Sequence, residues 1–189
     1  MIGLYEGNVF YDSDCLVCFL AVKQCEILQK LFSKVIVPLV VKHEILDPST
    51  PQYIKDNFNR LIELDFVEVK EMELRSAEHE RYIKLKHNYR FMGNGEAAVI
   101  AWTCENGGVI ASNNLSDVRG FVEDYDLNLI TTAFILAKAY EAGIKTRKEL
   151  DDIWEDMIQN GRKRSLPSKS FTQYYEGKYL DDMLYMGFD

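Results

Sequence analysis

The chain has few residues that break secondary structure: 4 prolines and 11 glycines among 189 residues. This scarcity argues against long linkers and disorder, and no low-complexity run or internal repeat is present. No apolar run is long enough to cross a membrane, and the N-terminal segment lacks the features of a signal peptide. We therefore expect one domain of ordinary size with a C-terminal tail, not bound to a membrane and located in the cytoplasm.

Positive charge is also scarce, because 22 Lys and Arg residues face 30 Asp and Glu residues, for a formal net charge of −8. A protein that coats nucleic acid electrostatically needs the opposite balance. An enzyme that concentrates carboxylates in a metal site is compatible with this composition, since bound cations reverse the local sign of charge. The acidic balance thus disfavours a DNA-coating module and leaves a hydrolase open.

Cysteine is limited to four residues, of which Cys15 and Cys18 form a C-x-x-C. A thioredoxin-like redox pair has this spacing, and a zinc site would need a second close pair. The surrounding segment 15–20 is wholly apolar, and Cys104 stands alone. We therefore expect reduced cysteines that pack as small hydrophobic residues.

Apolar, β-branched runs alternate with helical patterns along the chain. The expected strands lie at residues 8–11, 34–38, 66–69, 109–111 and 127–130. Helical spacing runs from Cys15 to Phe32, and a charged helix with an apolar stripe that includes Leu74 is expected over residues 73–88. This alternation predicts a three-layer α/β/α sandwich with a central parallel sheet of about five strands. Residues 1–145 would form this domain, and residues 146–189 a helical C-terminal extension packed on it.

Acidic residues occur at strand ends and on apolar helices, where an unpaired carboxylate is costly. The four that stand out are Asp12, Glu44, Glu96 and Asp117. Each alone has an ordinary explanation as a helix cap, a first-turn carboxylate or a solvated surface residue. At the carboxyl edge of a parallel sheet, where ligands bind, they would repel one another unless cations lay between them. That arrangement is typical of a Mg²⁺ or Mn²⁺ site for phosphodiester cleavage.

Four motifs around these acids resemble the PIN-domain family. Residues 9–13 are similar to its first motif, an apolar strand ending in Asp and a hydroxyl residue, and residues 37–46 resemble its second, with Pro and Glu. Residues 93–101, which read Gly-Asn-Gly-Glu followed by small and apolar residues, are very similar to the third and most specific motif. Residues 110–117 resemble the fourth, and the whole resemblance covers about residues 8–145. Residues 143–174 are also similar to a continuation found in some PIN-like bacterial proteins.

The resemblance implies a Mg²⁺- or Mn²⁺-dependent endoribonuclease, commonly the VapC-type toxin of a toxin–antitoxin pair. The residues that it implies as metal-binding and catalytic are Asp12, Glu44, Glu96 and Asp117. Ser13 and Ser112 would orient these acids through their hydroxyl groups. Asn114, in the same surroundings, stands where many members have Asp, so the site has one negative charge fewer. RNA would be the substrate, an antitoxin protein a partner, and a homodimer the expected assembly.

Two other functions fit part of the pattern. With Asn114 in place of an acid, the chain would suit a catalytically degenerate PIN-like scaffold that binds protein or RNA. The segment 12–14, Asp-Ser-Asp, also suits a haloacid-dehalogenase-like phosphatase with Ser112 in its second motif. That family needs a strand ending in paired aspartates, and Asp151-Asp152 instead lies in a helical pattern.

The C-terminal region offers two further features. The basic cluster Arg162-Lys163-Arg164 either binds RNA backbone or is a solvated helix end. The tyrosines Tyr174, Tyr175, Tyr179 and Tyr185 either stack on bases or pack on the domain, and packing is the commoner fate of such a tail.

Overall fold

The computed structural model describes residues 5–114, 124–125, 127–162 and 165–186. For residues 183–186 it describes the backbone only. At its centre is a five-stranded sheet in the order β3-β2-β1-β4-β5, in which all strands run parallel. The strands are β1 (Val9–Tyr11), β2 (Val35–Pro38), β3 (Val67–Lys70), β4 (Val109–Ala111) and β5 (Asn128–Ile130). All five coincide with the predicted runs to within one residue, because short buried apolar runs mark the inner strands of a parallel sheet and alternation marks the edge strand β3.

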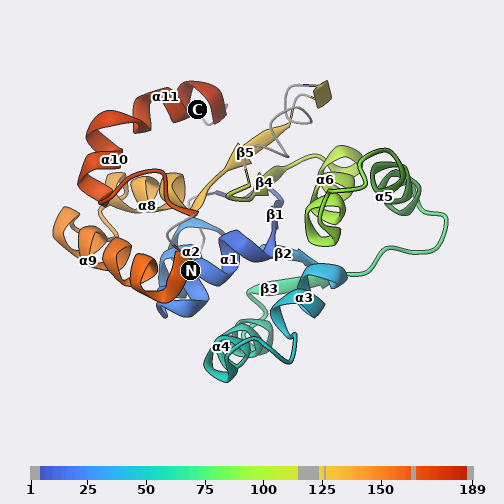
Figure 1. Cartoon of the computed structure of the whole chain (residues 1–189), viewed down its shortest axis with the longest axis horizontal. Helices are drawn as coiled ribbons and strands as arrows, with labels where there is room; N and C mark the ends of the chain where they lie inside the picture. The colour runs from blue at the N-terminus through green and yellow to red at the C-terminus, as the bar shows by residue number, and fades with distance from the viewer. Residues whose placement is uncertain (1–4, 115–123, 126, 163–164, 187–189) are drawn as a thin grey trace.

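Helices cover both faces of this sheet (Figure 1). On one face, α6 (Asn94–Asn106) contacts β1, β2 and β4, and α5 (Ala77–Asn88) packs against α6. The helices on the other side and at the sheet edge are α1 (Ser13–Ala21), α2 (Cys25–Leu31), α3 (Leu39–Ile45), α4 (Gln52–Glu63) and α8 (Thr132–Glu141). The predicted α/β/α sandwich is confirmed. Within the described ranges, no helix is both long and apolar enough to span a membrane.

The C-terminal region shares the core of the sheet domain. It consists of α9 (Arg147–Met157), η1 (Ile158–Arg162), α10 (Phe171–Gly177) and α11 (Tyr179–Met186). Trp154 of α9 is fully buried, donates its indole N–H to the Ser168 carbonyl at 3.1 Å and stacks on Tyr174. These side chains belong to the same hydrophobic cluster as the residues of β1 and α8. A domain boundary at 145/146 stays a prediction.

The tyrosines of this region pack on the domain, as expected for such a tail. Tyr174 and Tyr179 are buried, and Tyr175 stacks on Tyr179 with ring centroids 5.0 Å apart. The side chain of Tyr185 lies outside the described residues. The aromatic rings that the structure describes here therefore serve the core rather than an exposed base-stacking surface.

Two helical segments differ from their predictions. The helical spacing over residues 15–32 is divided between α1 and α2, because Lys23 between them adopts a left-handed φ of 57°. Helix α5 begins at Ala77 instead of residue 73, because the Ser76 hydroxyl caps it by accepting a hydrogen bond from the His79 N–H at 3.2 Å. Leu74 therefore lies before the helix and is 79% exposed, so it belongs to no apolar stripe.

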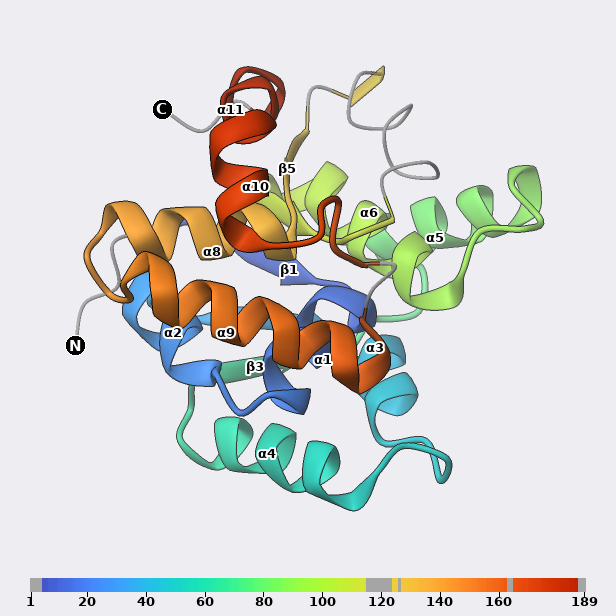
Figure 2. The same ribbon diagram turned by 60° about the vertical axis from the view of Figure 1, so that its left-hand side comes forward.

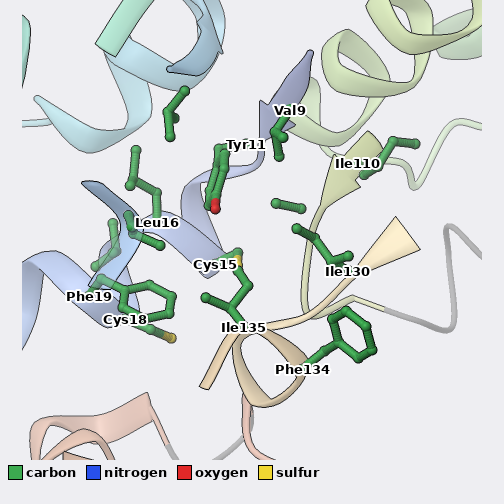
Figure 3. Close-up of a cluster of buried hydrophobic side chains, with 14 of the residues drawn as sticks. Val9, Tyr11, Cys15, Leu16, Cys18, Phe19, Ile110, Ile130, Phe134 and Ile135 are labelled. Carbon is green, nitrogen blue, oxygen red and sulfur yellow. The ribbon is translucent and has the colours of Figure 1, made fainter. Parts of the chain in front are cut away.

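The cysteines are free thiols. Cys15 and Cys18 are fully buried on α1, among side chains from β1, β4, β5 and α8 (Figure 3). The Thr132 hydroxyl lies 3.4 Å from Cys15 Sγ, and the Cys18 thiol donates to the Asp14 carbonyl at 3.2 Å. Burial raises the pKa of both thiols. The predicted packing as small hydrophobic residues is confirmed for Cys15 and Cys18, whereas Cys25 and Cys104 are only half-buried.

Native cysteines are expected to react slowly with thiol reagents at pH 8. Burial raises the pKa of Cys25 to about 12 and also raises that of Cys104. Because the thiolate is the reactive form, native labelling should be at least about 10-fold slower than labelling of the unfolded chain. A disulfide reagent followed by mass spectrometry measures this for each residue. Rapid labelling of Cys15 or Cys18 in the folded protein would contradict their burial.

Candidate active site

Polar residues gather at the carboxyl edge of the sheet. Asp12 follows β1, Ser112 follows β4 and Thr131 follows β5. The Asp12 N–H donates to the Ala111 carbonyl at 2.9 Å, and the Ser112 N–H donates to the Ile130 carbonyl at 3.0 Å. The strand pairing thus continues one residue past each strand and places these side chains at neighbouring positions of one edge.

Asp12 is held at this edge by two hydroxyl-bearing residues, and it is only 7% exposed. Its Oδ1 accepts from the Ser13 N–H at 2.7 Å, which makes Asp12 the N-cap of α1. Its Oδ2 accepts from the Ser112 hydroxyl at 3.3 Å, and the Asn114 N–H donates to that hydroxyl at 3.2 Å. The ordinary capping role predicted for this residue therefore coexists with a place in a buried polar network.

Helix α3 brings Glu44 to the same place. Val41 and Ile45, one turn apart, are buried against the core, which fixes the orientation of this short helix. Glu44 is exposed, and its Oε2 accepts from the Ser13 hydroxyl at 2.8 Å. Its Oε1 accepts from the Gly95 N–H at 2.9 Å. Glu44 thereby links the starts of α1 and α6 across the carboxyl edge of the sheet.

The first turn of α6 closes the site. Glu96 is 4% exposed, and its Oε2 accepts from the Gly93 N–H at 3.3 Å, a backbone donor that has no partner within the helix. Gly95 has no room for a side chain, because a Cβ there would lie 2.7 Å from Glu44 Oε2 and 2.9 Å from Asp12 Oδ1. The carboxylates of Asp12 and Glu44 therefore converge on the backbone at this glycine.

A fourth acid, Asp14, lies beside these three. The Asn113 N–H donates to its Oδ1 and Oδ2 at 3.3 and 3.1 Å. Burial raises the pKa of Asp14, whereas this hydrogen bond and the positive charge of Arg162 lower it. From the sequence alone, Asp14 is considered only as part of a phosphatase motif. Asp14 and Asn113 are 99 positions apart, so their contact could not be inferred from the sequence.

The local electrostatics are dominated by negative charge. The pKa of Asp12 is raised to about 8, mainly by burial and then by the charges of Asp14, Glu44 and Glu96, against the lowering effect of the Ser13 N–H. Carboxylates that share a buried site disfavour one another's ionisation. The hydrogen-bond donors and positive charges around Asp12 therefore do not fully offset the negative charge of these carboxylates.

Of the predicted acids, Asp12, Glu44 and Glu96 come together, and Asp117 lies outside the described residues. The hydroxyls of Ser13 and Ser112 each donate to one of the acids, to Glu44 and Asp12 respectively. Asn114 takes part through its backbone N–H. Two further groups belong to the site although the sequence alone does not assign them to it. These are the backbone N–H of Gly95, which donates to Glu44, and the positive charge of Arg162, which acts on Asp14.

The donor set suits Mg²⁺ or Mn²⁺. Within the described residues, no three carboxyl, imidazole or thiol groups are grouped closely enough to hold one ion between them. Mg²⁺, however, commonly takes only one or two carboxylates and keeps several waters. Asp12 and Glu44, which converge at Gly95, provide such a pair of hard oxygen ligands. The raised pKa of Asp12 also shows negative charge that a dication would offset.

A family model described as a PIN domain (DUF3368) matches residues 8–169. The chain belongs to the PIN-domain family. PIN domains are generally nucleases and typically use divalent metals. The match extends beyond the sheet and includes α9 and η1. No similar protein was found among curated proteins or among solved structures.

Membership of the PIN-domain family removes the basis for the phosphatase alternative. The structure also gives Asp151, one of the paired aspartates considered for it, a different role. Asp151 Oδ1 accepts from the Thr172 N–H at 2.9 Å, and its Oδ2 accepts from the Thr172 hydroxyl at 2.6 Å. Asp151 therefore ties α9 to α10, away from the carboxyl edge of the sheet.

Proposed function

We propose that this PIN domain is a Mg²⁺- or Mn²⁺-dependent endoribonuclease that hydrolyses RNA phosphodiester bonds. The observation that carries the proposal is the convergence of Asp12 and Glu44 on Gly95, with both carboxylates within 3.0 Å of the missing Cβ. Hydrogen bonds from Ser13, Ser112 and Gly95 fix both side chains before any ligand arrives. Such preorganisation is what a metal-dependent hydrolase needs.

In this proposal Asp12 and Glu44 hold the cation, and Glu96 and Asp117 complete the acidic set. The cation, when bound, would act as a Lewis acid toward the phosphate and lower the pKa of an attacking water. Ser112 keeps Asp12 Oδ2 oriented, and Ser13 does the same for Glu44 Oε2. The low exposure of Asp12 and Glu96 excludes water from their side chains and strengthens their interaction with a cation.

The alternative is a degenerate scaffold, suggested by Asn114. The backbone N–H of Asn114 donates to Ser112, a contact that any residue except proline could make. The pair Asp12 and Glu44, which carries the proposal, does not include position 114. This favours an active enzyme over a scaffold.

Mn²⁺ is expected to stabilise the folded protein and to support cleavage of a generic single-stranded RNA. At about 100 times the dissociation constant, binding adds about 2.7 kcal/mol, which corresponds to a rise of roughly 5 to 10 °C in Tm for a chain of this size. Thermal melting with Mn²⁺ or EDTA, run beside a gel assay of RNA cleavage, measures both. If Mn²⁺ produces neither stabilisation nor cleavage, the proposal is overturned in favour of the scaffold. Turnover of a phosphomonoester would support the phosphatase instead.

A toxin role, an antitoxin partner and a homodimer are further proposals, supported by the family resemblance alone. A small reading frame beside the gene would support the antitoxin. Light scattering of the purified chain, whose monomer mass is 21.9 kDa, tests the homodimer.

A further inference from the structure

A pocket opens beside the acids of the candidate site. Asp14 and Glu44 form one wall of it, and Ser49 and Thr50, which precede α4, form another. Arg162 of η1 lines the same pocket. Among the described residues, the pocket therefore combines the acidic site with hydroxyl groups and the cationic side chain of Arg162, a mixture suited to an anion that approaches a bound cation.

Arg162 comes from a part of the chain far from the other lining residues. In Figure 2, helix α9 crosses in front of α1, and Arg162, which follows α9, lines one pocket with Glu44 and Ile45 of α3. The chain turns there at Gly161, whose φ of 77° is a backbone conformation that side chains other than glycine rarely adopt. This turn delivers Arg162 to the pocket.

The guanidinium of Arg162 has a donor that is not hydrogen-bonded within the described residues. Its charge lowers the pKa of both Asp14 and Cys18, which places it close to α1. Its Nε is buried and has no hydrogen-bond partner among the described residues. A buried donor without an acceptor is costly, so a shift of this side chain that pairs it with an acceptor in the pocket would be favoured.

RNA must bring negatively charged phosphates to a site that is itself acidic, on a chain with a formal net charge of −8. Affinity for the backbone therefore requires a local cation close to the acids. The planar guanidinium matches the geometry of phosphate oxygens. We propose that Arg162 binds a phosphate of the RNA strand next to the bond that is cleaved, and so holds the strand across Asp14 and Glu44. This inference rests on the proposed function.

The test measures RNA affinity separately from cleavage. In the Asp12→Asn background, Arg162→Ala is expected to weaken binding of a short fluorescently labelled single-stranded RNA about 10- to 100-fold. The slope of log Kd against log salt should fall by about one. Arg162→Lys should restore part of the affinity, whereas Arg162→Gln, which keeps the size and loses the charge, should not. Arg60→Ala, which removes an exposed arginine at the far end of α4, is the matched control and should change little.

In the otherwise wild-type chain, Arg162→Ala should lower kcat/KM for RNA by a similar factor and leave the Mn²⁺-induced rise in Tm unchanged. If Arg162 only balances Asp14, the variants will change Tm and Mn²⁺ binding but leave RNA affinity as in the parent, which overturns the inference. Gln retains the bulk of the side chain, so Arg162→Gln gives the same test if the alanine variant folds poorly. Absence of Mn²⁺-dependent cleavage by the wild type would instead count against the proposed function, since RNA affinity is measured independently.

Discussion

Replacing Asp12 by Asn is expected to reduce RNA cleavage about 1,000-fold or more, because it removes the best-held ligand for the proposed cation. Asp12 is fixed by the Ser13 N–H and the Ser112 hydroxyl, so no other carboxylate can take its place without breaking these contacts. An amide of the same shape keeps the N-cap oxygen of α1 but not the charge. The fold should therefore remain while activity is lost.

The same substitution is expected to stabilise the metal-free protein at pH 8. Burial raises the pKa of Asp12 from 3.8 to about 8, with the nearby Asp14 as the next cause. The folded state therefore holds a proton that the unfolded chain releases above about pH 4. The metal-free wild type loses stability as pH rises through this window, and the loss is complete above about pH 8. Asn has no such loss, so its advantage should be on the order of 5 kcal/mol at pH 8 and should vanish near pH 4.

Melting in EDTA at several pH values, beside RNA cleavage in Mn²⁺, measures both effects. Asp152→Asn, an exposed position on α9, is the matched control and should alter neither. Cleavage by Asp12→Asn at the wild-type rate would show that the site is wrongly assigned. A stability difference independent of pH would show that Asp12 is not in the crowded, buried setting described above.

Gly95→Ala is expected to lose about 100-fold in cleavage activity and most of the Mn²⁺-induced stabilisation. The new Cβ would lie 2.7 Å from Glu44 Oε2 and 2.9 Å from Asp12 Oδ1, so these oxygens must move. A displacement of about 1 Å at a reacting centre is enough for a loss of this size. Overall stability should fall by only about 1 kcal/mol, because the exposed end of Glu44 can move aside and alanine favours the helix, while the displaced Asp12 Oδ1 weakens the cap of α1.

Gly177→Ala provides the comparison, since Gly177 is also helical and no atom lies within 4 Å of its ideal Cβ. It should keep full activity and gain slightly in Tm. Cleavage and Mn²⁺ melting curves of the two variants, measured together, separate loss of the site from loss of the fold. Normal Mn²⁺ binding by Gly95→Ala would mean that the cation does not lie between Asp12 and Glu44.

The sheet could be predicted from the sequence because its strands are short: β1, β2 and β4 are apolar runs, and β3 alternates apolar with charged residues. The residue after each strand could then be assigned to one edge, since parallel strands share their carboxyl ends. The break between α1 and α2 was missed because Lys23 adopts a left-handed backbone without glycine or proline to mark it. The late start of α5 was missed because a helical pattern alone did not favour Ser76 as a cap over earlier residues.

The candidate site was predictable only in part, for a physical reason. Local motifs identified Asp12 and Glu96 because each stands at a strand end or helix start with a characteristic neighbourhood. Contacts between distant segments leave no local pattern, so the convergence of Glu44 on Gly95 and the approach of Arg162 to Asp14 required the folded chain. Phe171 and Trp154 likewise gave no sign that they belong to the central core.

The burial of Trp154 has a consequence for how the chain acquires its final form during synthesis. The acids near the sheet edge leave the ribosome well before α9, whose tryptophan fills the shared core. A growing polypeptide that stops before residue 146 lacks this part of its interior and also the arginine that follows it. The ability to fold stably and to bind RNA should therefore appear late in translation, after most of the protein has been made.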